Sequence, residues 1–516
     1  MTENRRIVLN VAATYFRSLF SMACGFFISR WTLMALGKVD FGLMSVVGGL
    51  LAFVGIICRA LDGANGRFYA FAVGRARAAG GSAEAIDECR AWFSVSVLVH
   101  LVVPTILVGI GYPVGKWAIG NWLVIPADRV ADCKTIFTLS CITMYVGMIT
   151  VPLGAMYGAK QKIAELTIYS FIGTILSFVF GYYMVTHPGK WLIRLAYFSF
   201  VMANVPALII AVRAYVIFPE CRLSIRSMFD WSRLRQLLSF TAWCFFSVVC
   251  ILLRNEGVTI LINKLFGPAM NASFAVGKNL DNKTAMLTTA LKAGMNPAIT
   301  QACGAGEIER MRSLALQSCK LGILACMLFA LPLTLESHEA LRLWLKNPPE
   351  KSGIICVLLI VQHIFGISTQ GQATAVAAVG KIKMYELVSG GVGLLTLPVA
   401  CIVGYCGGGV YAVCGSLAVM MLVYSGLRAI MASRIGVVPF GRWFSKVVVP
   451  ATMVAAASVA AGFCSRFLLP QGLPRLALTT FLCEAAFLPL AWFVALSREE
   501  RAYVKSRIAI KRLLGK

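Results

Sequence analysis

The chain of 516 residues contains fourteen apolar stretches, each long enough to cross a lipid bilayer as a helix. About 20 consecutive apolar residues span the hydrocarbon core, where the backbone must satisfy its own hydrogen bonds in helices or closed barrels. Short breaks rich in charged residues, proline or glycine separate the stretches. The pattern predicts an all-α polytopic membrane protein with about 14 transmembrane helices. The stretches cover residues 8–36, 41–66, 92–114, 135–157, 164–184, 195–212, 237–265, 269–302, 314–333, 354–379, 387–405, 410–430, 447–463 and 476–496.

The composition excludes several other classes of protein. Apolar residues make up 59% of the chain and charged residues only 14%, against roughly 25% charged residues in ordinary globular domains. A soluble enzyme, a secreted disulfide scaffold and a disordered regulator are therefore ruled out. Most of the 17 cysteines lie inside apolar stretches without a metal-binding spacing, which predicts small buried side chains, no metal and no cofactor. The first stretch is too long for a signal-peptide core and is expected to be retained.

The basic residues that give the formal charge of +26 are distributed along the chain as expected for a membrane protein. Lysine and arginine concentrate in the breaks after every second stretch and in the tail at residues 498–516. Cytoplasmic loops carry this excess in membrane proteins, so both termini are predicted to be cytoplasmic. Nucleic acid is not expected as a partner, because topology accounts for the charge. The tail suits either a helix lying on anionic membrane lipids or a solvated segment.

The second half of the sequence repeats part of the first half. A shift of 230 residues superposes two pairs of glycines, Gly37 on Gly267 and Gly74 on Gly304. A shift of 221 residues aligns two copies of a Lys-x-Lys-x-x-Glu-Leu motif, the first at 160–166. Two six-helix lobes are predicted, in parallel orientation because six is an even number. The predicted divisions are a first lobe at 1–230, a second lobe at 231–440, two further helices at 441–497 and a basic cytoplasmic tail at 498–516.

Eight basic residues fall at membrane depth, where exposure to lipid is costly. Each would cost about 2.5 to 3.5 kcal/mol on insertion scales, whereas the whole net stability of a protein is about 5 to 15 kcal/mol. We therefore expect them to face a polar cavity between the two lobes that holds water, counter-charges or a ligand. These residues are Arg17, Arg30, Arg59, Arg254, Lys278, Lys283, Lys292 and Lys320.

Five of these cations are predicted to bind an anionic substrate, because guanidinium and ammonium groups suit phosphate oxygens. The alternative for each cation is a structural ion pair with a nearby carboxylate. His363, beside Gln362, is expected to form a polar contact between helices rather than a proton relay. The predicted binding residues are Arg17, Arg30, Arg59, Arg254 and Lys278, and the predicted gating counter-charges are Asp62, Glu256 and Asp281.

Motifs for catalysis are scarce. The sequence has no GxxxxGK[ST] loop of the kind that hydrolyses ATP. Glu336, His338 and Glu339 lie close together in a predicted outer loop, but their spacing is not that of an HExxH zinc site. The chain is therefore expected not to be an enzyme. A membrane glycan polymerase or ligase that uses these three residues is the alternative.

Two segments carry a family resemblance. The first is Leu36-Gly37-Lys38-Val39-Asp40-Phe41-Gly42, which runs into Val46-Val47-Gly48-Gly49-Leu50. The second extends from Arg254-Asn255-Glu256-Gly257 through Phe266-Gly267-Pro268 to Asn296-Pro297. Together they resemble bacterial polysaccharide flippases of the Wzx type, members of the superfamily that includes the multidrug and toxin extruders, or MATE-like exporters.

The resemblance implies two lobes that alternate between inward-open and outward-open states in the bacterial inner membrane. The implied cargo is an undecaprenyl-diphosphate-linked oligosaccharide, a polyprenyl-diphosphate glycan moved to the periplasmic leaflet for surface polysaccharide biosynthesis. The alternative is an ion-coupled exporter of cationic drugs, with H+ or Na+ as the coupling ion. The first stretch contains no Asp or Glu, which disfavours a drug site of that kind there, while Glu256 and Asp281 keep the alternative open.

Overall fold

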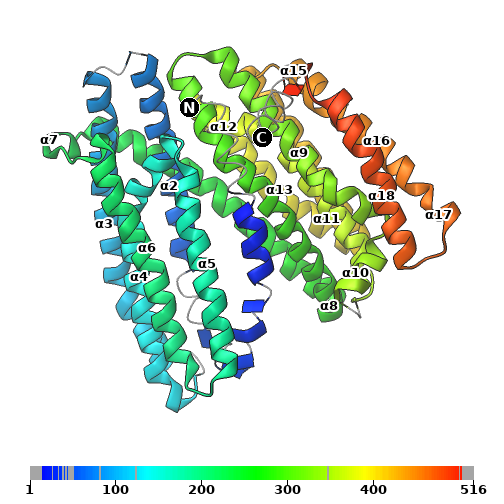
Figure 1. Ribbon diagram of the computed structural model, residues 1–516, viewed down its shortest axis with the longest axis horizontal. Helices are drawn as coiled ribbons and strands as arrows, with labels where there is room; N and C mark the ends of the chain where they lie inside the picture. The colour runs from blue at the N-terminus through cyan, green and yellow to red at the C-terminus, as the bar shows by residue number, and fades with distance from the viewer. Residues whose placement is uncertain are drawn as a thin grey trace, which may run out of the picture. The chain divides into compact units, whose positions relative to one another are not determined.

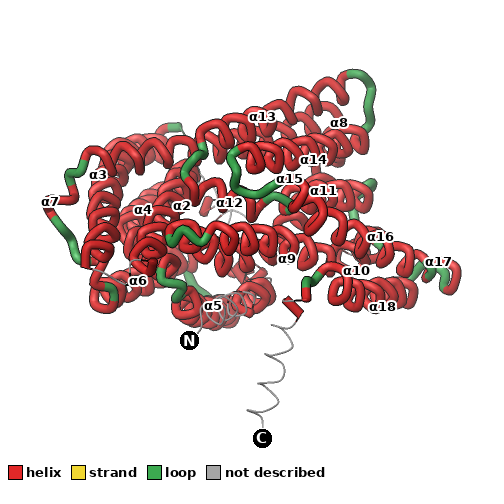
Figure 2. The backbone as a smooth tube through the Cα atoms, turned by 90° about the horizontal axis from the view of Figure 1, so that it is seen from above, coloured by secondary structure: helices red, strands yellow, loops and turns green. Residues whose placement is uncertain are grey.

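The computed structural model describes residues 14, 16–25, 27–28, 30–32, 34–37, 40, 43–44, 52–78, 80, 83–122, 125–345, 348–498 and 500–501. The side chains at 52–60, 83–85, 268–269, 272, 286–287 and 290 lie outside this description, as does most of the predicted cytoplasmic tail. Across the described residues every regular element is a helix (Figures 1 and 2). The predicted all-α polytopic class is confirmed.

The helices follow one another with short connections. Short 3-10 helices lie at Ala127–Arg129 and Pro219–Cys221, and π-helical turns at Phe444–Val448 and Ala491–Ala495. The α-helices are α2 (Ala52–Ala78), α3 (Ala83–Asn121), α4 (Val130–Ala159), α5 (Ile163–Thr186), α6 (Trp191–Ile217), α7 (Ile225–Met228), α8 (Trp231–Gly304), α9 (Ile308–Leu335), α10 (Ser337–Leu345), α11 (Ser352–Ile367), α12 (Gln370–Val379), α13 (Lys383–Tyr405), α14 (Val410–Arg434), α15 (Phe440–Trp443), α16 (Val449–Phe463), α17 (Ser465–Leu468) and α18 (Leu473–Leu490).

Twelve helical stretches of the described residues are long and apolar enough to cross a membrane. Each overlaps one of the predicted spans, and together they indicate a multi-pass membrane protein. The stretches are Phe16–Gly37, Ile86–Asn121, Ala127–Ala159, Ile163–Thr186, Trp191–Ile217, Trp231–Gly267, Ile308–Leu335, Ser352–Val379, Lys383–Tyr405, Val410–Arg434, Phe440–Leu468 and Leu473–Ala495.

The two remaining predicted spans, 41–66 and 269–302, fall on helices that are less apolar. The first overlaps α2, and the second is the part of α8 that follows Gly267. Charged side chains interrupt both segments, including Asp62 in α2 and Lys278 in α8. In both halves of the repeat, this position is therefore occupied by a helix that charged side chains interrupt.

Helix α8 changes direction at Gly267, whose backbone has φ 81° and ψ 175°. Lys278 Nζ lies 3.2 Å from Thr259 Oγ1, although a straight helix would separate residues 19 positions apart by about 28 Å. The two parts of α8 consequently run back alongside each other. Gly37, the equivalent of Gly267 in the repeat, also has a positive φ of 72°. Glycine adopts this conformation without the cost that a Cβ atom would add.

The chain packs as two compact units. Unit 1 comprises Met1–Val248 and Ala293–Met311, and unit 2 comprises Val249–Lys292 and Arg312–Lys516. These units are defined by packing, whereas the predicted lobes at 1–230 and 231–440 are defined by the sequence repeat. The predicted divisions of the chain stay a prediction.

In unit 1, helices α3, α4 and α6 pack side by side (Figure 1). The helix Phe16–Gly37 packs against α5 through aromatic rings, with centroids 4.6 Å apart for Phe20 and Phe171 and 4.9 Å apart for Trp31 and Phe178. Such offset ring pairs add to the free energy of apolar burial. Buried members of the core are Ile119, Ile136, Phe137, Cys141, Met184, Trp191 and Leu192.

The C-terminal ends of α2 and α8 cross within unit 1, and their backbones come into close contact at two glycines. A Cβ atom added to Gly74 would lie 2.2 Å from the carbonyl oxygen of Gln301, and one added to Gly304 would lie 2.1 Å from that of Phe71. Because 230 residues separate Gly74 from Gly304 and Phe71 from Gln301, the two contacts are equivalent in the repeat. The crossing therefore has local two-fold symmetry, and it requires the absence of a side chain at both glycines.

In unit 2, the core joins both parts of α8 with α11, α13 and α14. Helix α16 packs against α18, with the thiol of Cys483 3.4 Å from the carbonyl oxygen of Ser458. The buried apolar side chains of the core include Val258, Leu261, Ile262, Phe274, Ile355, Leu359, Ala400, Val413 and Leu417.

Candidate functional site

Three of the predicted site residues line one pocket within unit 2. Arg254, Lys278 and Asp281 surround a volume of about 70 Å³. All three belong to α8, and the change of direction at Gly267 brings the two parts of that helix together. Apolar side chains from α8, α11 and α14 close the rest of the pocket. Two cations and one carboxylate therefore share a small space lined otherwise by amides and apolar groups.

Arg254 has a neutral partner in this pocket. Its Nε and one terminal nitrogen each donate to Oδ1 of Asn255 at 3.1 Å. Among the described residues, no carboxylate lies within the 4 Å ion-pair distance of the half-buried guanidinium. An amide oxygen satisfies donors but cancels no charge. The alternative of a structural ion pair, considered from the sequence, does not describe Arg254.

Lys278 contacts one carboxylate and one hydroxyl group at longer distances than the contacts of Arg254 with Asn255. Its ammonium lies 3.4 Å from Oε1 of Glu256 and 3.2 Å from Oγ1 of Thr259. The Glu256 side chain is 62% exposed, and exposed ion pairs contribute only about 0 to 1 kcal/mol. This pairing leaves the ammonium able to exchange Glu256 for another anion at little cost.

Asp281 pairs with a histidine rather than with Arg254. Its Oδ1 lies 2.8 Å from Nδ1 of His363 on α11. The buried Nε2 of His363 and Oε1 of Gln362 have no hydrogen-bond partner among the described residues. The sequence predicted a polar contact between helices at these two residues, but no local pattern indicated that Asp281 would be the partner. Asn255 and Asn282, which also line the pocket, were likewise missed.

Four further predicted site residues, Arg17, Arg30, Arg59 and Asp62, lie in unit 1. Arg17 is half-buried and Arg30 is exposed, both on the helix Phe16–Gly37, and Asp62 is exposed on α2. No carboxylate of the described residues lies within ion-pair distance of Arg17 or Arg30. The side chain of Arg59 lies outside the described residues, so its expected pairing with Asp62 stays a prediction. The cavity expected between the lobes also stays a prediction.

The acidic residues of the predicted outer loop are held by arginines. Glu336 accepts a bond of 2.8 Å from Arg475, and the Glu336 side chain is 2% exposed. Glu339 lies 3.6 Å from Arg342 in α10. Among the described residues, no group of His, Cys, Asp and Glu is arranged to hold a metal ion. The pairing of Glu336 with Arg475 is that of a structural ion pair.

Comparison with known proteins gives a family match over part of the chain and a fold match over most of it. Residues 244–396 match the family model described as MatE. A solved MATE structure in complex with MaD3S has a TM-score of 0.70 at 12% identity, covering 86% of this chain and 97% of that chain. The outward-facing conformation of a multidrug resistance MATE family transporter of the MOP superfamily has a TM-score of 0.69 at 12% identity, with the same coverage.

A third similar structure is a MOP superfamily transporter from Pyrococcus furiosus, described as having a binding pocket of reverse polarity that suggests a different function. Its TM-score is 0.67 at 13% identity, covering 86% of this chain and 97% of that chain. No curated protein matches the sequence. The fold is that of these MATE structures, and the MatE family model matches residues 244–396 of the same chain.

Proposed function

We propose that this chain is a flippase for a lipid-linked oligosaccharide in the bacterial inner membrane. It moves an undecaprenyl-diphosphate-linked glycan from the cytoplasmic to the periplasmic leaflet by alternating access, with both termini in the cytoplasm. The observation that carries the proposal is the half-buried guanidinium of Arg254, which contacts a neutral amide rather than a carboxylate. A cation held in this way favours an anionic cargo.

The chemistry of the pocket in unit 2 suits a diphosphate. Arginine presents several donors in a planar fork, which matches two phosphate oxygens at once. Lysine adds a point charge that rotates freely toward a third oxygen. In the proposed cycle, Arg254 releases Asn255 and Lys278 releases Glu256 as the phosphates enter. Arg17, Arg30 and Arg59 are proposed to contact the same cargo, with Asp62, Glu256 and Asp281 as gating counter-charges.

A similar argument has a precedent in the same fold. For the Pyrococcus furiosus transporter, the reverse polarity of its binding pocket is described as suggesting a different function. In the present chain, Arg254 and Lys278 outnumber Asp281 among the charged residues of the pocket in unit 2. The lining is therefore not the acidic one that a cationic drug would need.

One observation favours a second function, an ion-coupled exporter of cationic compounds. Asp281 lines the pocket in unit 2, and its Oδ1 lies 2.8 Å from Nδ1 of His363; carboxylates and histidines within membrane helices commonly mark ion pathways. One of the solved neighbours is a multidrug resistance transporter. In this case H+ or Na+ would exchange for the drug at Asp281, and Arg254 would be dispensable.

Binding to the purified protein separates the two functions. We expect a short-chain polyprenyl diphosphate to bind the wild-type chain and to bind Arg254→Gln about tenfold more weakly, as expected for loss of a charge-assisted hydrogen bond. Lys264→Gln, at an exposed lysine on the same helix, is the matched control and should bind as the wild type does. If a lipophilic cation binds instead, and its binding depends on Asp281 but not on Arg254, the exporter is the correct function.

A further inference from the structure

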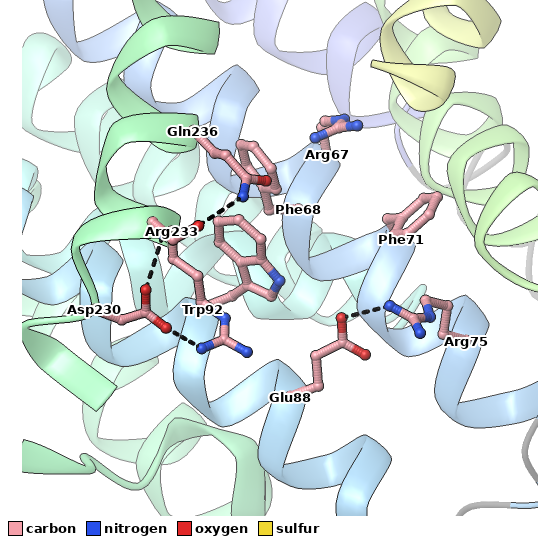
Figure 3. A pocket seen from close by; sticks show the side chains of 10 residues that line it. Arg67, Phe68, Phe71, Arg75, Glu88, Trp92, Asp230, Arg233 and Gln236 are labelled. Atoms are coloured by element: carbon pink, nitrogen blue, oxygen red, sulfur yellow. Dashed lines mark hydrogen bonds and ion pairs between the residues drawn. The ribbon is translucent and has the colours of Figure 1, made fainter. Parts of the chain in front are cut away.

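Ion pairs account for many of the arginines and lysines among the described residues. In a pocket of about 380 Å³ within unit 1, for example, Arg75 lies 2.9 Å from Glu88 (Figure 3). Two cations of unit 2, Lys292 in α8 and Arg428 in α14, differ in this respect. No carboxylate of the described residues lies within ion-pair distance of either one. Lys292 is half-buried and Arg428 is only 9% exposed, so water screens these charges incompletely.

Two tyrosines orient the guanidinium of Arg428. Its Nε donates to the hydroxyl of Tyr385 at 2.8 Å, and its central carbon lies 5.1 Å from the ring centroid of Tyr424. Glu386 acts on this charge only from beyond ion-pair distance. The two terminal nitrogens donate to no described residue, and neither is fully covered by the protein. Arg428 is therefore held in place by neutral groups and keeps donors for an anion.

Helix packing places Lys292 beside the end of α11. A Cβ atom added to Gly322 of α9 would lie 2.8 Å from Ile367, the last residue of α11, and 3.8 Å from Leu291. Lys292 follows Leu291 directly in the chain. Its ammonium makes no hydrogen bond with a described residue and is not fully covered. The end of α11 thus has an accessible positive charge next to it.

Arg428 reaches the same end of α11 from the side of α14. Ser425, one turn before Arg428, donates its hydroxyl to the carbonyl oxygen of Phe365 at 2.7 Å. The two cations are close enough for the charge of Arg428 to act on the ammonium of Lys292. Like charges repel each other, and more strongly where water is scarce. An anion that bound between them would replace this repulsion by two attractions.

The start of α12, which follows directly, offers further groups that suit an anion. The hydroxyl of Thr369 at the N-cap and both polar atoms of the Gln372 amide are buried without a partner among the described residues. The thiol of Cys319, a weak acceptor, accepts from the backbone N–H groups of Gly371 and Gln372. Helical side chains lean toward the N-terminus, and that end of a helix favours negative charge.

We propose that Lys292 and Arg428 form a second phosphate site in unit 2, beside the N-terminus of α12. It receives the diphosphate of the cargo before the pocket of Arg254 does, and the identity of this ligand rests on the proposed function. Lys278 and Lys292 lie on nearly the same face of α8, about 21 Å apart along the helix. Lys292 is the nearer of the two to the predicted cytoplasmic end, where the cargo would enter.

The charge of the site distinguishes the cargo from other sources of phosphate. The diphosphate of a lipid-linked glycan carries two negative charges, which equals the charge of Lys292 and Arg428 together. The phosphodiester of an ordinary anionic phospholipid carries one negative charge and would leave one cation unmatched. Inorganic phosphate has no lipid chain to hold it at the level of the membrane helices.

The test uses Arg254→Gln as its background, so that the pocket described above contributes little. Binding of a fluorescent short-chain polyprenyl diphosphate is measured on the purified full chain in detergent. We expect Arg254→Gln to retain binding, and its combination with Lys292→Gln to bind about tenfold more weakly, as for one hydrogen bond to a charged group. Lys292→Arg keeps the charge and should retain binding on the same background. Lys264→Gln, at an exposed lysine of α8, is the control.

Four results would overturn the proposal. If Arg254→Gln binds equally with and without Lys292→Gln, the second site is wrong and the proposed function stands. If Lys292→Arg loses as much binding as Lys292→Gln, the position is structural. If an equal concentration of phosphatidylglycerol or inorganic phosphate displaces the label from Arg254→Gln, the site belongs to that ligand. If the wild type binds no polyprenyl diphosphate, the proposed function fails, and this assignment fails with it.

Discussion

Arg77 donates to Glu307 across 3.0 Å, and the two residues are 230 positions apart, the spacing at which the sequence repeats. Equivalent positions of a repeat meet directly only where an axis of symmetry passes between them. Gly74 and Gly304 lie one turn away and make reciprocal contacts with the backbone of the opposite helix. The crossing of α2 and α8 is thus a symmetric junction of a close backbone contact and an ion pair.

The close contact at this junction predicts a steric effect of a single methyl group. Gly304→Ala would place a Cβ atom 2.1 Å from the carbonyl oxygen of Phe71, so the helices must separate. Overpacking of this kind costs about 1 to 3 kcal/mol. Gly63→Ala, at a glycine of α2 with open space around it, is the matched control. Thermal unfolding in detergent should show a clear loss of stability for Gly304→Ala only, and equal midpoints for the two variants would contradict the crossing.

The ion pair at the junction predicts a pH dependence of stability. Burial alone would raise the pKa of Glu307, but the hydrogen bond and charge of Arg310, together with Arg77, lower it below its usual value of 4.5. A carboxylate with a lowered pKa stabilises the folded state above the unfolded pKa, and this stability is lost as the pH falls through the folded pKa.

Thermal unfolding between pH 7 and pH 4 measures this effect. Glu307→Gln should be less stable than the wild type at pH 7, and the difference should shrink toward pH 4. Asp87→Asn, an exposed residue on α3, should leave the pH profile of the wild type unchanged. A difference between wild type and Glu307→Gln that stays constant with pH would count against the role of the carboxylate.

A buried ion pair in unit 2 gives a prediction of stability. Lys320 Nζ lies 2.6 Å from Oε2 of Glu500, with side chains only 9% and 15% exposed. Removing one partner of such a pair leaves a buried charge and costs about 3 to 5 kcal/mol. We expect Lys320→Ala to unfold at a markedly lower temperature, and the double variant Lys320→Met with Glu500→Gln to recover most of the loss. If the double variant unfolded at the same temperature as Lys320→Ala, the ion pair with Glu500 would not explain the loss of stability.

The carboxylate of the pocket in unit 2 distinguishes the two candidate cargoes. If the cargo is anionic, Asp281→Asn removes a repulsive charge and strengthens binding of a polyprenyl diphosphate at least roughly fivefold, or by about 1 kcal/mol, which is the interaction of two unit charges about 4 Å apart at the dielectric constant of water, near 80. Binding titrations on purified protein measure the change, with Lys264→Gln as the control. Loss of diphosphate binding in Asp281→Asn would contradict the proposed role of the pocket.

Local patterns were sufficient to predict most of the fold. Apolar length predicts a helix because a backbone in lipid must bond to itself, so the positions of the spans follow from the sequence. The repeat was visible through two pairs of glycines, because a positive φ favours glycine at Gly37 and Gly267 and close backbone contacts leave no room for a side chain at Gly74 and Gly304. The reversal of α8 at Gly267 is the local event that brings Arg254 and Lys278 to one pocket.

Partners that lie far apart in the chain could not be predicted. Asp281 meets His363, and Lys320 meets Glu500, although no periodic pattern connects residues 82 or 180 positions apart. From the sequence, arginines near the ends of spans were explained by membrane topology. Topology predicts the side of the membrane on which an arginine lies, but not the groups that it contacts.

The most direct test of the account is transport by the chain reconstituted in liposomes with a fluorescent polyprenyl-diphosphate sugar. Chemical quenching from outside measures the fraction of labelled lipid that changes leaflet. The account predicts transport by the wild type and by Lys264→Gln, and at least a tenfold lower rate for Arg254→Gln at equal amounts of folded protein. Transport by Arg254→Gln at the wild-type rate would contradict the claim that this guanidinium receives the diphosphate.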